Sequence, residues 1–180
     1  MKPIVATDLP RYDISKSYRW NCEHAPAPAD LESVRGPGGW TLCGLPVDSP
    51  LGMPAGPLLN GRWVLYYASL GFDVLTYKTV RSSSRDCYPL PNLQPVETGQ
   101  LLGDERRLPT SAEMLGSWAV SFGMPSMSPA DWRADVERTR AAFPAGKPLS
   151  VSGVGPVQPA STSAHRADDA ARALRCAVAR

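Results

Sequence analysis

The stretch that decides the fold is residues 50–80, PLGMPAGPLLNGRWVLYYASLGFDVLTYKTV. It opens with a short apolar run that contains glycine, which predicts a strand ending in a turn. Asn60 is a typical helix N-cap and Gly71 a typical residue after a helix end, so we expect a helix over 61–70. The apolar run 72–77 follows at once and predicts a buried strand. A strand, a helix and a second strand form a βαβ unit, which implies a parallel sheet covered by helices.

The same pattern repeats further along the chain. After a long loop at 81–110, residues 117–121 predict a third strand. Ser128, followed by proline and an acidic residue, predicts the start of a helix that runs to about residue 143. Residues 148–152 predict a fourth strand and 166–180 a last helix. About four parallel strands fit half of a (β/α)₈ barrel or part of an open doubly wound sheet, and the pattern alone does not separate these folds.

Residues 1–36 differ from the rest and predict an extended N-terminal arm. Ala25-Pro26-Ala27-Pro28 resists helix formation. The arm also carries aromatic residues among polar ones, and we expect these to pin it to a larger body: Tyr12, Tyr18 and Trp20. We therefore divide the chain into the arm, 1–36, and the first part of the α/β unit, 37–180.

Composition excludes several classes of partner. The 180 residues are 43% hydrophobic and 20% charged with a net charge of +2, which provides no broad basic field for nucleic acid. No signal peptide and no apolar window of membrane-spanning length is evident, so we expect a cytoplasmic protein with no membrane partner. The four cysteines lack Cys-x-x-Cys spacing, which predicts reduced thiols and no metal site. We expect a small-molecule partner.

Ligands of parallel α/β proteins bind beyond the carboxyl ends of the strands, and four polar or glycine-containing segments fall there. They are Ala55-Gly56, Lys78-Thr79, residues 121–126 and residues 152–155. Lys78 is the most informative, because a lysine directly after an apolar strand either extends to solvent or meets a negative group. Gly56 and Gly123 allow the backbone to approach a ligand closely, although each alone is also typical of a simple turn.

Three segments together resemble a known family. Residues 50–57 (PLGMPAGP), 71–80 (GFDVLTYKTV) and 121–125 (SFGMP) occur in the order and at the spacing of the dihydroorotate dehydrogenases, of the class 1-like type. The resemblance implies a TIM (β/α)₈ barrel and an FMN-dependent oxidoreductase that acts on a CH–CH bond in pyrimidine biosynthesis. Its substrate would be dihydroorotate or a related compound.

The resemblance also assigns site residues. The resemblance places a turn and a lysine–threonine pair against FMN. The turn is Ala55-Gly56, and the pair is Lys78-Thr79. The residues that it assigns to substrate are Lys78, Ser121, Phe122, Gly123 and Met124. No residue of the chain matches the family's catalytic base.

The chain also departs from the family pattern. Val120 stands where the family has a substrate-binding asparagine, and Ser126 replaces a second one. About four of the eight barrel strands are expected, without the segment that carries the Cys or Ser base and without the glycine loops for the FMN phosphate. We therefore expect an N-terminal half that is inactive alone.

Two other functions remain open from the sequence. One is a non-catalytic remnant, or a half-barrel that assembles with a second copy or a complementary half through its open edge. The other is a small α/β protein that binds phosphate with Lys78, Arg81 and backbone N–H groups.

Overall fold

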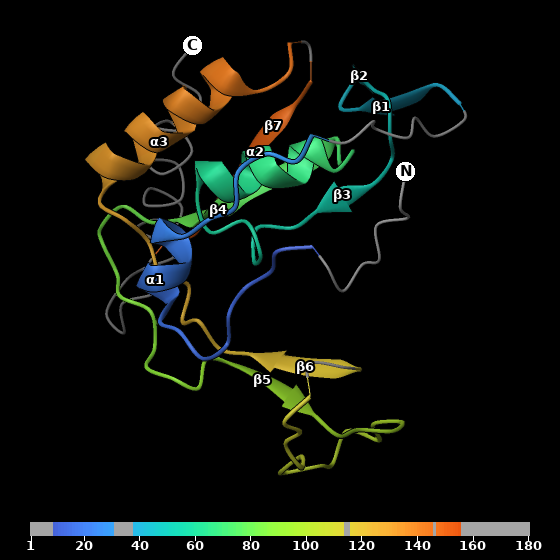
Figure 1. The fold of residues 1–180 in the computed structure, drawn as a ribbon, viewed down its shortest axis with the longest axis vertical. Helices are drawn as coiled ribbons and strands as arrows, with labels where there is room; N and C mark the ends of the chain where they lie inside the picture. The colour runs from blue at the N-terminus through green and yellow to red at the C-terminus, as the bar shows by residue number, and fades with distance from the viewer. Residues whose placement is uncertain (1–8, 31–37, 114–115, 146, 156–180) are drawn as a thin grey trace.

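The computed structural model describes residues 9–30, 38–113, 116–145 and 147–155. Its centre is a three-stranded parallel sheet in the order β3-β4-β7 (Figure 1), formed by β3 (Gly52–Met53), β4 (Val74–Val80) and β7 (Leu149–Gly153). Leu75 of β4 pairs with Met53 on one side and with Leu149 on the other. Apart from β5 and β6, which lie outside this sheet, the strands follow one another in space as in the chain, an order consistent with part of a TIM barrel.

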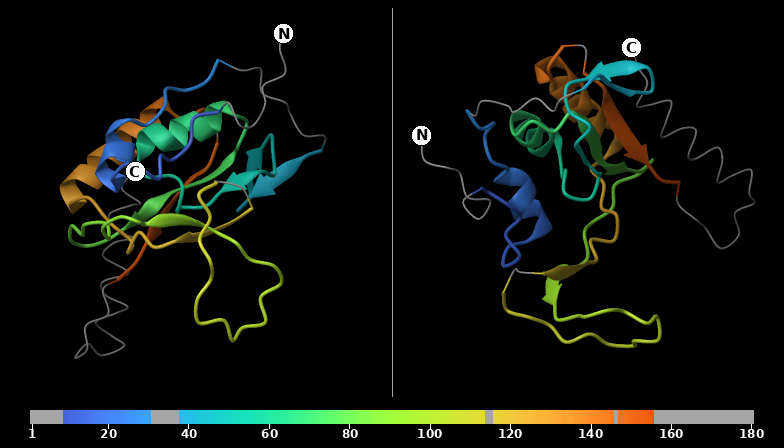
Figure 2. Two further views of the ribbon diagram at one scale, coloured as in Figure 1. Left: turned by 60° about the horizontal axis from the view of Figure 1, so that its bottom comes forward. Right: turned by 90° about the vertical axis from the view of Figure 1, so that its right-hand side faces the viewer.

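Helices α2 (Gly61–Ser69) and α3 (Pro129–Ala142) cover one face of this sheet (Figure 2). Both begin as the sequence predicts: the Asn60 side chain accepts a hydrogen bond from Trp63 N at 3.2 Å, and Ser128 Oγ accepts one from Asp131 N at 3.2 Å. Gly71, with φ of 90°, follows the end of α2. These two of the three predicted helices are confirmed.

The two faces of the sheet differ in chemistry. On the helix side, a buried set that we call the sheet–helix cluster consists of Leu58, Val64, Leu75, Tyr77, Val80, Trp132 and Phe143. On the other side, hydroxyl groups pair across the strands: Thr76 Oγ1 lies 2.7 Å from Ser150 Oγ, and Thr79 Oγ1 lies 3.0 Å from Ser152 Oγ. The pairing of β4 with β7 shifts between Tyr77 and Val80, so Thr79 joins the hydroxyl face.

The prediction of a third parallel strand over 117–121 is wrong. β6 (Ser117–Val120) pairs antiparallel with β5 (Leu93–Val96), in a hairpin that projects from the body (Figure 1). β5 lies inside the segment that we expected to be loop, and all four residues of β6 are exposed. The described residues therefore hold three strands in the parallel sheet, not about four. Strands of a parallel sheet are buried on both faces and are therefore mostly apolar. The short run of β6, all of whose residues are exposed, does not meet this requirement.

The prediction of a wholly extended arm is also wrong. The arm contains α1 (Tyr18–Glu23), because Ser17 acts as an N-cap and its Oγ accepts from Trp20 N at 3.1 Å. Residues 25–30 have no helix, as the prolines predict. Tyr12 and Tyr18 do pin the arm, since their rings lie 5.2 and 5.3 Å from the ring of Phe122. The arm closes a second buried set, the arm cluster: Ala25, Leu59, Trp63, Tyr66, Leu93 and Phe122.

The rest of the described chain adds one small hairpin. β1 (Trp40–Leu42) and β2 (Leu45–Val47) pair antiparallel ahead of β3. The predicted helix at 166–180, and residues 1–8 and 31–36 of the predicted arm, lie outside the described residues. In the part of the chain that is described, no helix has the length and apolar character needed to cross a bilayer.

Candidate functional site

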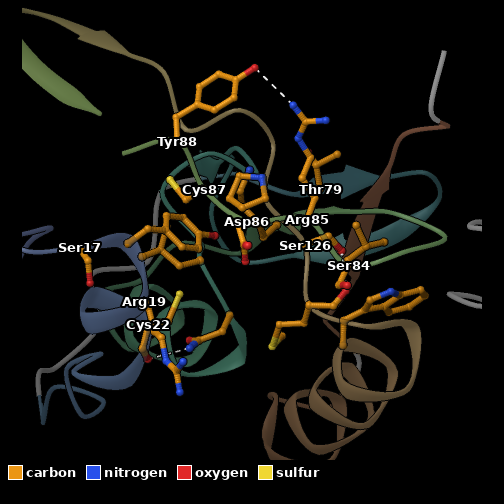
Figure 3. A pocket seen from close by; sticks show the side chains of 18 of the residues that line it. Ser17, Arg19, Cys22, Thr79, Ser84, Arg85, Asp86, Cys87, Tyr88 and Ser126 are labelled. Carbon is orange, nitrogen blue, oxygen red and sulfur yellow. Dashed lines mark hydrogen bonds between the residues drawn. The ribbon is translucent and has the colours of Figure 1, made fainter. Parts of the chain in front are cut away.

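A cavity of about 750 Å³ opens at the C-terminal end of β4. Residues 77–80 form one wall. Beside them lie Leu59 and Asn60, directly before α2, and Asp131 and Trp132 in the first turn of α3. α1 of the arm, the loop 84–92 and residues 125–127 complete the lining (Figure 3). The volume is within the usual range for small-molecule sites, about 300–1,000 Å³.

Lys78 is the central charge of this cavity. Its side chain comes from within β4, not after it as the sequence suggested, and the residue is only 7% exposed. No hydrogen bond or ion pair joins its Nζ atom to another of the described residues. Burial lowers the pKa of Lys78, an effect that the nearby thiols of Cys87 and Cys22 oppose. A buried ammonium without a counter-charge is costly, so Lys78 favours an anionic group beside it, within a lining that also holds Glu23, Asp86 and Asp131.

Thr79 connects the cavity to the hydroxyl face of the sheet. It lines the cavity beside Lys78, and its Oγ1 atom lies 3.0 Å from Ser152 Oγ of β7. Since β4 and β7 are parallel, this pair marks the carboxyl edge of the sheet, where ligands of α/β proteins bind.

Ala55 and Gly56 lie at the same edge of the sheet but outside the cavity lining. They follow β3, in a turn at residues 55–57. A Cβ atom built on Gly56 would meet no heavy atom within 4 Å, so the space beside this turn is open. The turn is accessible to a flat ligand, but the structure does not join it to Lys78 in one pocket.

The side chains of residues 121–124 do not line the cavity. Phe122 is buried in the arm cluster, and Ser121 and Met124 are exposed. Gly123 has φ of 73°, and a Cβ atom there would lie 2.9 Å from the ring of Tyr88. The residues that follow, Pro125 and Ser126, do line the cavity. Any contact of 121–124 with a ligand would therefore involve backbone or a rearranged segment.

Sequence reasoning missed most of the loop 84–92 that lines the cavity, including Cys87 and Asn92. Asn92 is 3% exposed, and its Nδ2 atom donates to Cys87 Sγ at 3.4 Å. Tyr12 of the arm donates its hydroxyl hydrogen to Asn92 Oδ1 at 3.1 Å. Burial raises the pKa of the Cys87 thiol. No local motif marks these residues, because only the packing of the arm against the loop brings them into the cavity.

Other charged groups around the cavity are mostly engaged with protein. Arg85 lines the cavity and donates to the Tyr88 hydroxyl at 3.3 Å. Arg81, which the phosphate-binding hypothesis uses, is outside the lining and donates from Nε to the carbonyl of Met124 at 3.0 Å. Among the described residues, no three His, Cys, Asp or Glu side chains gather as a metal site would require.

A curated protein is similar to most of this chain. The chain is 32% identical over 174 residues to the dihydroorotate dehydrogenase of Dictyostelium discoideum, and the match covers 87% of the chain. This match and the solved structures below support a fragment of the dihydroorotate dehydrogenase family. It spans about half of this relative, 46% of its length. No protein-family model matches the chain.

Solved structures agree at the level of the fold. Ligand-free DHODH from Eimeria tenella superposes with a TM-score of 0.57 and 16% identity, over 84% of this chain and 38% of the other. The same enzyme in complex with ferulenol gives a TM-score of 0.56 and 16% identity, over 84% and 36%. The mixed α/β arrangement of this chain is thus similar to part of the fold of these two structures.

Proposed function

We propose that this chain contributes to a flavin-dependent oxidoreductase that uses FMN and acts on dihydroorotate or a related small carboxylate. The observation that carries the proposal is Lys78: a buried ammonium, without a protein partner among the described residues, at the carboxyl edge of a parallel sheet. Similarity to a dihydroorotate dehydrogenase over 87% of the chain supports the same chemistry. The activity belongs to a protein about twice the length of this chain, so the chain supplies part of the machinery.

The residues at the sheet edge fit a flavin. Lys78 would neutralise negative charge of the cofactor or substrate, and the Thr79 hydroxyl would offer a hydrogen bond beside it. The open turn at Ala55 and Gly56 would let a flat ring approach the backbone. When bound, FMN supplies the hydride acceptor. These residues bind and orient, and we assign no catalytic base to them.

FMN binding by the purified chain tests this proposal. Titration followed by flavin fluorescence should show quenching that saturates, and Lys78→Met should weaken it by about tenfold or more, because a buried charge-assisted contact is lost. Lys16→Met is a matched control, since Lys16 is exposed and lies outside the cavity lining. A folded chain that leaves FMN fluorescence unchanged, or a Lys78→Met variant that binds as wild type does, would contradict the proposal.

A second candidate is a half-barrel that needs another chain to complete its site. The parallel sheet supports it: among the described residues, β3 and β7 each pair with one strand only, and the hydroxyl face lacks a helix layer. Light scattering during size-exclusion chromatography distinguishes the candidates. If only a dimeric fraction quenches FMN fluorescence, assembly is required, whereas a monomer that binds FMN favours the first proposal.

A further inference from the structure

The hydrogen bonds of the β5–β6 hairpin determine which backbone groups of β6 face outward. Ser121 N donates to the carbonyl oxygen of Asn92 at 2.9 Å, so these two residues form a hydrogen-bonded pair. Such pairs alternate with non-hydrogen-bonded pairs in an antiparallel ladder. The register therefore gives Trp118 and Val120 non-hydrogen-bonded positions opposite β5. The N–H and C=O groups of these two residues point away from β5.

The two outer edges of this hairpin differ. The edge of β5 is covered, because Ser111 N donates to the carbonyl of Pro95 at 3.0 Å and Glu97 N donates to that of Pro109 at 2.9 Å. Pro95 lies opposite Trp118, and its carbonyl points outward as the alternation requires. Among the described residues, β6 pairs with no strand except β5, and all of its residues are exposed. The β6 edge is thus open to a further strand.

The β6 edge carries apolar side chains and no charge. Trp118 and Val120 project from the same face of the hairpin as Pro95 and Leu93, their partners in the register. That face is buried over β5, where Leu93 is 8% exposed, but Trp118 is 43% and Val120 62% exposed. Proteins commonly protect a free edge with a charged side chain or a proline, and the sequence of β6, SWAV, has neither. This edge is suited to strand pairing.

We propose that the β6 edge pairs with the β6 edge of a second copy of this chain, antiparallel, about a twofold axis at Ala119. This pairing sets Trp118 opposite Val120 of the second copy, and both residues direct their N–H and C=O groups toward the partner strand. Each such pair is hydrogen-bonded and joins an aromatic to a β-branched side chain. The uncharged strand meets its own copy without like-charge repulsion. Assembly stops at the dimer, because the β5 edge of each copy is covered.

The size of this interface sets the strength of the dimer. Four residues from each copy bury far less than the roughly 1,200 Å² of a stable interface. We therefore expect a weak dimer with a dissociation constant of about 10 μM to 1 mM. The pairing uses neither the cavity nor the open edges of β3 and β7, so it is independent of the proposed function and of half-barrel assembly.

Sedimentation velocity over concentrations that bracket this dissociation constant tests the proposal. Val120→Pro removes one outward N–H group and leaves the ladder with β5 intact, so it should weaken dimerisation by about tenfold or more. Val120→Lys places two lysines on one face of the joined sheet and should abolish the dimer. Gln100→Lys is the matched control, because it adds the same charge at an exposed position of the loop between β5 and β6 and should dimerise as wild type does.

Amide hydrogen exchange followed by NMR gives the same test without a substitution. The N–H groups of Trp118 and Val120 should exchange freely at low concentration and be protected at high concentration. The N–H group of Ala119 faces β5 and should be protected at both. Exchange at residues 118 and 120 that does not depend on concentration would overturn the pairing.

The outcomes of sedimentation separate this dimer from other assemblies. A chain that stays monomeric over the whole range overturns the proposal. A dimer that Val120→Pro and Val120→Lys leave unchanged also overturns it, because association then occurs at another surface, such as the open edges of the parallel sheet. Growth beyond a dimer overturns the twofold pairing. Near-UV circular dichroism of each variant establishes that it is folded.

Discussion

The sheet–helix cluster and the arm cluster are both buried, but the chain builds them in different ways. The first uses strands and helices that follow one another, such as Val64 of α2 and Leu75 of β4. The second joins segments that are far apart, such as Ala25 of the arm and Phe122 after β6. Helix α2 serves both, with Val64 on one side and Trp63 on the other. The cavity draws its lining from both clusters, including Leu59 and Trp132.

This difference separates stability from ligand recognition. The βαβ unit provides the scaffold and Lys78, whereas the arm and the loop before β5 line the cavity with residues such as Cys22 and Asn92. We therefore expect changes in the sheet–helix cluster to unfold the chain, and changes in the arm to alter local order and the site.

The largest effect should come from Leu75→Ala, at the centre of the sheet–helix cluster. Leu75 is 1% exposed and packs in a strand with neighbours on both sides. Truncation leaves a cavity and should lower the free energy of unfolding by about 2–5 kcal/mol. Urea denaturation followed by tryptophan fluorescence measures it. A loss below about 1 kcal/mol would mean that this cluster contributes little to the stability of the fold.

A smaller loss is expected for Gly61→Ala, where α2 and α3 approach each other. An added methyl group would overlap Thr139 Oγ1, and Thr139 is 2% exposed. Overpacking of this kind costs about 1–3 kcal/mol. The double variant Gly61→Ala with Thr139→Ala removes the overlapping atom and should be less destabilised than the two single changes added together. Additive losses in urea denaturation would contradict the contact.

Asn21→Ala should loosen the arm alone. The Asn21 side chain accepts from Asp13 N at 2.7 Å and donates to the carbonyls of Asp13 and Ser17 at 3.0 Å. Their loss should lower the free energy of local opening by about 1–3 kcal/mol. Hydrogen exchange by mass spectrometry should show faster exchange in residues 9–30 and unchanged exchange in β4. Equal acceleration in both would show that the clusters unfold as one unit.

Alkaline pH should weaken the arm cluster through Tyr12. Burial raises the pKa of Tyr12 from 10.0 to about 12, so the folded state favours the neutral phenol. The stability from this group is complete below pH 10 and is lost as the pH rises through about 12. Tyr12→Phe should therefore lose less stability than wild type between these pH values, as followed by the urea midpoint. Burial also raises the pKa of Tyr77, so both proteins should weaken. Identical losses would exclude a contribution from Tyr12.

The smallest effect is expected at Val120, in the projecting hairpin. Val120 is 62% exposed and belongs to neither cluster. Val120→Asn should change the free energy of unfolding by less than about 0.5 kcal/mol, as is usual for exposed positions. It should also leave orotate affinity unchanged, because residue 120 lies outside the cavity lining. A gain in affinity would show that the hairpin folds over the site when ligand is present.

Local signals in the sequence predicted the scaffold well. Asn60, Ser128 and Gly71 mark helix ends through hydrogen bonds and backbone angles that involve residues close in the chain. The same reasoning failed for β6, because its strand character was evident but its partner was not. The partner, β5, has a proline in its centre and was expected to be loop.

The sequence by itself determined the βαβ unit, the two capped helices and the position of Lys78 at the carboxyl edge of the sheet. These depend on periodicity, capping and strand direction, which are local properties of the chain. Only the tertiary structure decided that β6 leaves the parallel sheet, that the arm forms a wall of the cavity, and that Asn92 faces it. Each of these depends on contacts between distant segments, such as the 80-residue separation of Tyr12 and Asn92, for which a single sequence contains no local signal.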